Sequence, residues 1–173
     1  MRTLNLAVIV AAIFLFLSPL TIAEGKTTSL ISLTHAISIA EDRIKAQAIE
    51  AKMATSDNKV VYEIDLLHTG KLYEITMDAE NGDFLKAKTP MLEGLWHKLL
   101  HPNRLKIAET LEPLSKMLQA FEQKTGGSVQ QVALYLDDDQ PFYGIKLQTD
   151  AGIADIELNA LTGERTPSSS ASQ

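Results

Sequence analysis

Three residues that could coordinate a metal follow one another at intervals of four: Glu93, His97 and His101. In a helix this spacing places them along one face, where a carboxylate and two imidazoles could bind zinc or copper. Gly94 weakens such a helix, and His101 directly precedes Pro102, before which a helix ends. The favoured interpretation is therefore the polar edge of a short helix, with a metal site as the alternative.

Other candidate sites have simpler interpretations. The acidic run at 137–139 could bind calcium, but it lacks the spaced oxygen ligands and the bidentate glutamate of a calcium loop, which favours a solvated turn. Tyr135 is the one tyrosine without the spacing of a buried strand residue, and it could belong to a ligand surface. There is no cysteine, nucleophile elbow, His-Glu-x-x-His motif, phosphate loop or dinucleotide fingerprint. The sequence therefore argues against an enzyme, and no cofactor is expected.

Residues 60–88 indicate the secondary structure in which these candidate residues lie. Apolar and polar side chains alternate along this stretch. Tyr62, Ile64 and Leu66 alternate with Glu63 and Asp65. The same alternation continues through Tyr73, Ile75 and Met77, with Glu74 and Thr76 between them. A period of two is typical of an antiparallel sheet with one buried and one solvent-facing side. Glu63 and Glu74 are expected to point to solvent.

The same pattern recurs 81 residues later without a gap. The shift brings Tyr62 onto Tyr143, Ile75 onto Ile156 and Gly82 onto Gly163. A constant offset through two strands and a turn indicates an internal repeat. The turn residues of the repeat are expected to be Asp78 and Gly82 in the first unit and Asn159 and Gly163 in the second, with positive φ at both glycines.

Each unit begins with a predicted helix. Ser32 is the expected N-cap of the first, over about 33–46, and Glu41 lies off its apolar stripe. In the second unit, Thr110 is the expected cap and Pro113 lies in the first turn. The predicted fold class is α+β: two tandem units, each with one helix on a three-stranded antiparallel sheet and each with its own core.

The turn motif carries a resemblance to a known family. Tyr62-Glu-Ile, followed by Asp-Ala-x-x-Gly-x-x-Leu from Asp78 to Leu85, resembles the PepSY domain. Asn159-Ala-Leu-Thr-Gly163-Glu is similar, with Asn in place of Asp. The resemblance implies a helix against a small antiparallel sheet, an extracytoplasmic location and a non-catalytic role that is often linked to restraining peptidases.

The remaining segments complete the expected organisation. Residues 1–23 carry one charge, a long apolar run and small residues at Thr21 and Ala23, as a periplasmic or secreted protein's signal peptide does. Without cleavage they would be a membrane anchor, and after cleavage no stable membrane insertion is expected. The predicted units span 27–88 and 107–167. Between them lies a linker, 89–106, whose short amphipathic helix contains Trp96, and a serine-rich tail predicted to be disordered follows at 168–173.

Charge narrows the classes of partner. The chain has 16 basic and 22 acidic residues, and removal of residues 1–23 takes away one Arg, which changes the net charge from −6 to −7. Nucleic acid and anionic membranes select basic surfaces and are therefore disfavoured. An extracytoplasmic protein is the expected partner, bound through Glu63, Glu74 and Trp96, and the resemblance to the PepSY domain implies a peptidase as one candidate. The alternatives are a periplasmic module for a small ligand or metal, and a structural adaptor in an envelope complex.

Overall fold

The computed structural model describes residues 29–89 and 107–166. The first unit contains one helix and four strands: α1 (Leu33–Ile44), β1 (Gln47–Ser56), β2 (Lys59–His68), β3 (Lys71–Asp78) and β4 (Phe84–Lys88). The second unit contains α4 (Leu114–Thr125), β5 (Ser128–Asp137), β6 (Gln140–Thr149) and β7 (Gly152–Asn159), and residues 107–108 before α4 are also helical. The predicted α+β class is correct, and Ser32 caps α1 by accepting a hydrogen bond from the His35 N–H.

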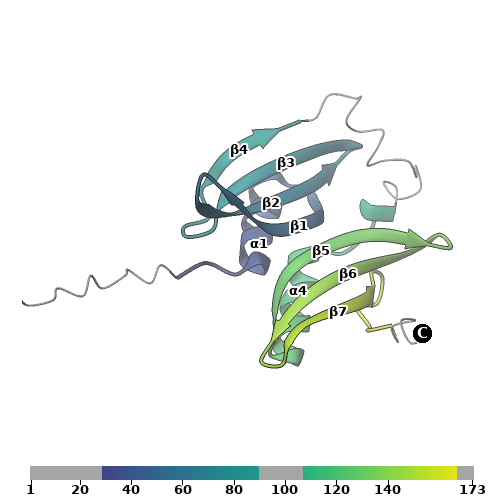
Figure 1. Ribbon diagram of the computed structural model, residues 1–173. Coiled ribbons are helices and arrows are strands. Elements are labelled where there is room, and N and C mark those ends of the chain that lie inside the picture. The colour runs from purple at the N-terminus through teal and green to yellow at the C-terminus, as the bar shows by residue number, and fades with distance from the viewer. Residues whose placement is uncertain (1–28, 90–106, 167–173) are drawn as a thin grey trace, which may run out of the picture.

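The strands form one sheet, which corrects the prediction of two separate three-stranded sheets. Its order is β4-β3-β2-β1-β5-β6-β7, and all pairs are antiparallel. Figure 1 shows the continuous sheet with β4 and β7 at its two edges. The units join because β1 and β5, the first strand of each, pair with one another over three residue pairs and so cover part of two exposed edges. β4 is an additional strand that extends only the first unit.

Each shared element of the second unit lies 81 residues after its counterpart in the first. Helix α4 starts and ends 81 residues after α1, and the same offset relates β5, β6 and β7 to β1, β2 and β3. Even the irregularities repeat. The register shifts once in the β1–β2 pair between Ala48 and Glu50, and once in the β5–β6 pair between Val129 and Gln131. The two units therefore share one fold, element by element.

The pairing between the units is nearly symmetric. Ala51 pairs with Val132, its own equivalent in the repeat, while Glu50 pairs with Ala133 and Lys52 with Gln131. Thus Glu50 pairs with the equivalent of Lys52, and Lys52 pairs with the equivalent of Glu50. A two-fold axis between Ala51 and Val132 describes this arrangement, as in the isologous interface of a symmetric dimer.

The buried side chains form one core, which corrects the expectation of a separate core in each unit. Both helices pack against the joined sheet, and they also contact each other. The cluster includes Ile37 and Tyr62 from the first unit and Leu118 and Tyr143 from the second, and each of these side chains is buried. The units cannot be separated without exposing parts of this shared core.

Several predictions concern residues outside the described ranges. These are the signal peptide at 1–23, the linker residues Glu93, Trp96, His97 and His101, and the tail at 168–173. Within residues 29–89 and 107–166, neither helix has the length and apolar character needed to cross a membrane.

Candidate functional site

The polar side of the first unit contains the two glutamates predicted to face solvent. Glu63 is exposed and forms an ion pair with Lys52 on the neighbouring strand at 3.1 Å. Glu74 is partly buried, and its cross-strand neighbours are Asp65 and Lys88. Rows of acidic and basic side chains therefore run across the strands and line a shallow hollow of about 250 Å³. This surface suits contact with a polar protein surface better than enclosure of a small molecule.

The polar side of the second unit has a different character. Tyr135 stacks on Phe142 with ring centroids 5.9 Å apart, and its hydroxyl donates a hydrogen bond to Glu157. Burial raises the pKa of Tyr135, and the hydrogen bond to Glu157 and the charge of that carboxylate raise it further. The ring of Tyr135, which the sequence analysis named as a candidate for a ligand surface, is thus partly buried and is held in place by Phe142 and Glu157. The two units present different surfaces to a partner.

Carboxylates near the boundary of the units are already hydrogen-bonded. A cavity of about 600 Å³ lies there, and its lining includes Glu41, His68 and Glu109. Glu109 accepts a hydrogen bond from the Gly70 N–H at 2.7 Å. Among the described residues, no group of three or more histidine, cysteine or acidic side chains is placed to hold a metal ion. In the acidic run at 137–139, Asp137 ends β5, and Asp138 and Asp139 form the turn to β6.

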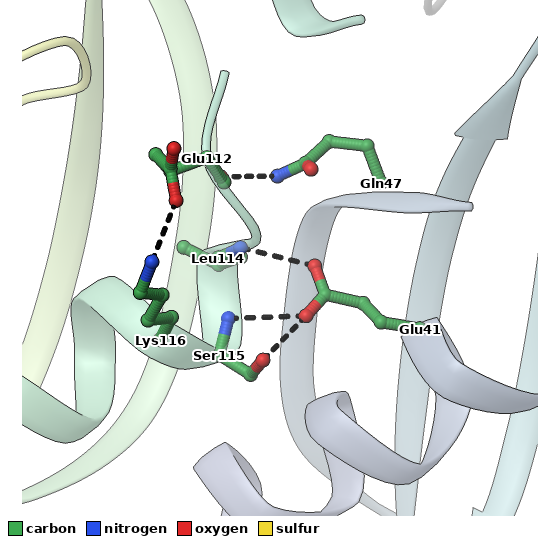
Figure 2. Close-up of polar contacts among 6 residues, drawn as sticks. All are labelled: Glu41, Gln47, Glu112, Leu114, Ser115 and Lys116. Carbon is green, nitrogen blue, oxygen red and sulfur yellow. Dashed lines mark hydrogen bonds and ion pairs between the residues drawn. The ribbon is translucent and has the colours of Figure 1, made fainter. Parts of the chain in front are cut away.

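Sequence reasoning missed the role of Glu41, which Figure 2 shows at the boundary of the two units. Its carboxylate is buried and accepts hydrogen bonds from the Ala48 N–H at 3.1 Å, the Leu114 N–H at 3.0 Å and the Ser115 N–H at 3.2 Å. The Ser115 hydroxyl donates a fourth bond at 2.5 Å. Pro113, at the N-cap of α4, makes no side-chain capping bond. A side chain of the first unit therefore caps the helix of the second.

Thr110 does not cap α4, contrary to the sequence-based prediction. Its hydroxyl donates to the Ile107 carbonyl at 2.7 Å, and the helix begins at Leu114. The nearby Glu112 carbonyl accepts a hydrogen bond from the Gln47 side chain at 3.0 Å. The segment before α4 is thus held against the first unit, and the carboxylate of Glu41 takes the capping role. One signal existed in the sequence: the offset of 81 places Glu122 at the position equivalent to Glu41. In the structure, Glu122 makes the equivalent bond to the Val129 N–H at 2.7 Å.

The turns that follow the third strand of each unit are alike. Gly82 has φ of 75° and Gly163 has φ of 69°. The Gly82 N–H donates to the Asp78 carbonyl at 2.9 Å, and the Gly163 N–H donates to the Asn159 carbonyl at 2.8 Å. A positive φ is readily adopted by glycine and strained for other residues.

The outer edge of the third strand distinguishes the two units. In the first unit β4 covers it, from the Met77–Phe84 pair to the Glu74–Lys88 pair. In the second unit the corresponding pairing begins with the Leu158–Arg165 bridge and a hydrogen bond from the Thr166 N–H to the Glu157 carbonyl at 2.9 Å. The next residue in the sequence is Pro167, which has no N–H to donate.

Beyond that bridge, no strand of the described chain covers β7. Its N-terminal half includes Ile153, which is 66% exposed, and Asp155, which is also exposed. β7 is eight residues long, and its part before Glu157 forms the open edge, which can pair with a strand of another protein. We take the open edge of β7 as the candidate binding site.

Comparison with known proteins identifies the first unit. Residues 30–88 match the family model described as "Peptidase propeptide and YPEB domain", or PepSY. No curated protein matches the chain. The chain is also similar to a crystal structure of a candidate lipoprotein from Clostridium difficile 630, with a TM-score of 0.43 and 23% identity, covering 82% of this chain and 94% of that one. The match to the family model therefore assigns residues 30–88, the first unit, to the PepSY domain.

Proposed function

We propose that this chain is a non-catalytic, extracytoplasmic binding protein, periplasmic or secreted, whose partner pairs a strand with the open edge of β7. The observation that carries the proposal is the difference between the repeats: β4 covers the edge of β3, while the equivalent edge of β7 has no described strand against it beyond the Leu158–Arg165 bridge. The partner's strand would occupy the place that β4 has in the first unit. Main-chain hydrogen bonds would supply affinity, and side chains near Ile153 would supply selectivity.

The directions of the backbone groups support this mode of binding. The Glu157 carbonyl accepts a bond from Thr166, and the Asn159 N–H donates to the Glu164 carbonyl, so both residues direct their backbone groups away from β6. Along a strand, successive residues direct their backbone N–H and C=O groups to opposite sides, so every second residue faces the same edge. Ile153 and Asp155 therefore present their N–H and C=O groups to the open edge as well. These groups can form the ladder that strand addition requires.

A peptidase is the first class of partner to test. The family model that matches residues 30–88 describes a peptidase propeptide domain. Propeptide domains act on peptidases without catalysing a reaction themselves, which agrees with the absence of a catalytic motif in the sequence. We therefore propose that the partner is an extracytoplasmic peptidase and that binding restrains it.

Strand addition is tested by a substitution that affects only the open edge. Partners would be captured from envelope extract with the purified protein and identified by mass spectrometry. The affinity of a purified partner would then be measured for the wild type, Asp155→Pro and Asp155→Ala. Proline removes an outward N–H without removing a bond to β6. Alanine is the matched control, because both variants lose the ion pair between Lys146 and Asp155 at 2.9 Å.

We expect Asp155→Pro to weaken binding about tenfold or more and Asp155→Ala to have little effect, because exposed ion pairs contribute little. Circular dichroism and thermal unfolding would verify that both variants fold. Equal affinity of the two folded variants would exclude the β7 edge as the interface. If the partner is a peptidase, its rate of peptide hydrolysis should fall as wild-type protein is added, and an unchanged rate would exclude restraint.

A further inference from the structure

In the first unit, the chain itself fills a groove between α1 and the turn after β3. The segment before α1 enters this groove. The Ile31 N–H donates to the Ala79 carbonyl at 2.9 Å, and the Tyr62 hydroxyl donates to the Ile31 carbonyl at 2.5 Å. The side chains of Ile31 and Ile39 fill the space beside Gly82. A methyl group added at Gly82 would lie 2.9 Å from Ile39 Cδ1 and 3.3 Å from Ile31 Cδ1. An extended segment with an aliphatic side chain therefore occupies the groove.

The equivalent groove in the second unit lacks these filling groups. Under the offset of 81, Glu112, Ala120 and Arg165 take the places of Ile31, Ile39 and Phe84. The segment before α4 leads elsewhere, because the Glu112 carbonyl is bonded to Gln47. A methyl group at Gly163 would have one neighbour within 4 Å, Met117 Cγ at 3.7 Å. A groove of about 580 Å³ remains between α4 and the turn that contains Gly163.

The lining of this groove is mainly apolar and basic apart from Glu112, whose carboxylate forms an ion pair with Lys116 at 2.9 Å. Met117 and Phe121 lie along α4, and Leu161 on the opposite turn is 61% exposed. Lys124 and Arg165 also line the groove, and neither forms an ion pair with any described residue. The groove is thus complementary to a segment that combines an aliphatic side chain with a carboxylate.

We propose that the groove of the second unit binds an extended peptide segment of a partner protein, with an aliphatic side chain against Phe121 and Leu161 and an acidic side chain beside Lys124 and Arg165. The Ala160 carbonyl, the equivalent of the Ala79 carbonyl that binds Ile31 N–H, accepts no hydrogen bond within the described chain and would accept one from the segment. The proposal rests on the proposed function, since it gives the chemistry of a second contact with the same partner.

The test uses a fluorescein-labelled synthetic peptide, Glu-Glu-Leu-Ile-Glu-Glu, and a control peptide in which lysine replaces each glutamate. Fluorescence anisotropy would measure binding of each peptide to the full mature chain. The decisive variant is Ala120→Ile, which reproduces the filling by Ile39 in the first unit. Its matched control is Gln123→Ile, which adds the same side chain at an exposed position of α4 that does not line the groove.

We expect the acidic peptide to bind, the basic peptide not to bind, and Ala120→Ile to weaken binding at least about tenfold while Gln123→Ile does not. Lys124→Glu should weaken binding by a similar factor, whereas Lys59→Glu, an exposed change in the first unit, should not. Added salt should lower the affinity. Binding that Ala120→Ile leaves unchanged would overturn the proposal.

Two other occupants would give different results. Binding that appears only after deletion of residues 167–173 would assign the groove to the chain's own C-terminal segment. A concentration-dependent dimer that Ala120→Ile abolishes would assign it to a second copy. Either result would overturn the proposal. The β7 edge is tested separately by Asp155→Pro, which leaves the groove residues intact, so failure of peptide binding and failure of strand addition are distinguishable.

Discussion

Glu41 Oε1, in the last turn of α1, accepts a hydrogen bond from the Leu114 N–H at 3.0 Å, across 73 residues of sequence. The first N–H groups of a helix have no partner within it, and their partial positive charge favours a carboxylate. The same carboxylate also accepts the Ala48 N–H within its own unit. Glu41 therefore couples the end of one helix, the start of its own sheet and the start of the second helix.

Glu41→Gln should destabilise the whole protein by about 2 kcal/mol, because the bonds to a charged acceptor are replaced by weaker ones and the amide NH₂ faces N–H donors. The matched control is Glu122→Gln. Glu122 makes the equivalent bond to the Val129 N–H but caps no helix among the described elements, and it is partly exposed. Its replacement should cost about half as much or less. Urea denaturation measures both values. Equal losses would show that the contact between the units adds no stability.

The repeat made the helix and the first three strands of each unit predictable, but it did not predict the contacts between the units. Alternation and the offset of 81 predicted one helix and three strands in each unit, and these were found. The β1–β5 pairing was missed because it uses main-chain groups that every strand has, and nothing in the types of Ala51 and Val132 indicates a neighbour. Glu41 was interpreted as a residue off the apolar stripe, since a buried carboxylate cannot be told from an exposed one by periodicity. β4 was missed because the three-stranded plan ended at the Asp78–Gly82 turn.

Gly82→Ala should be more destabilising than Gly163→Ala, although both glycines have positive φ. The conformational strain is shared and costs of the order of 1 kcal/mol. At Gly82 the added methyl would also lie 2.9 Å from Ile39 Cδ1, while at Gly163 its nearest neighbour would be 3.7 Å away. We expect an additional loss of about 1 kcal/mol at Gly82 from overpacking. Thermal or urea unfolding of the two variants measures the difference, and a larger loss at Gly163 would contradict the packing argument.

The stability of the protein should fall at alkaline pH partly through Tyr135. Its pKa is raised in the folded state by burial, by its bond to Glu157 and by nearby negative charge. The stabilising contribution is therefore fully present below the unfolded tyrosine pKa, about 10, and is lost as the pH rises towards the folded pKa. Tyr135→Phe should be less stable than the wild type at about pH 8, and the gap should narrow at about pH 11. Urea denaturation at both values tests this, and a constant gap would contradict it. Tyr62, whose pKa burial also raises, is present in both proteins.

Zinc should bind weakly or not at all to the linker that contains Glu93, His97 and His101. The sequence reasons are Gly94, which weakens the helix, and Pro102, before which the helix should end. Isothermal titration calorimetry of the wild type and His97→Ala with zinc chloride would measure this. Submicromolar affinity that is lost in His97→Ala would establish a metal site and favour the alternative function as a metal-binding module.

The polar side of the first unit provides the test that separates the two units as binding surfaces. Glu63→Lys combined with Glu74→Lys reverses two charges that the sequence predicts to contact the partner. Glu63 is exposed and Glu74 is partly exposed. The polar contacts of both side chains, which include the solvent-accessible ion pair between Lys52 and Glu63, are lost, so the folded state should lose about 1–2 kcal/mol. If a partner spans the whole sheet, its affinity should fall about tenfold, chiefly through slower association at low salt. If a partner binds only at the β7 edge, the double variant should bind like the wild type while Asp155→Pro does not.

Surface plasmon resonance with the purified partner measures both rates. Loss of binding in the charge variant together with full binding by Asp155→Pro would move the interface to the first unit and contradict strand addition at β7.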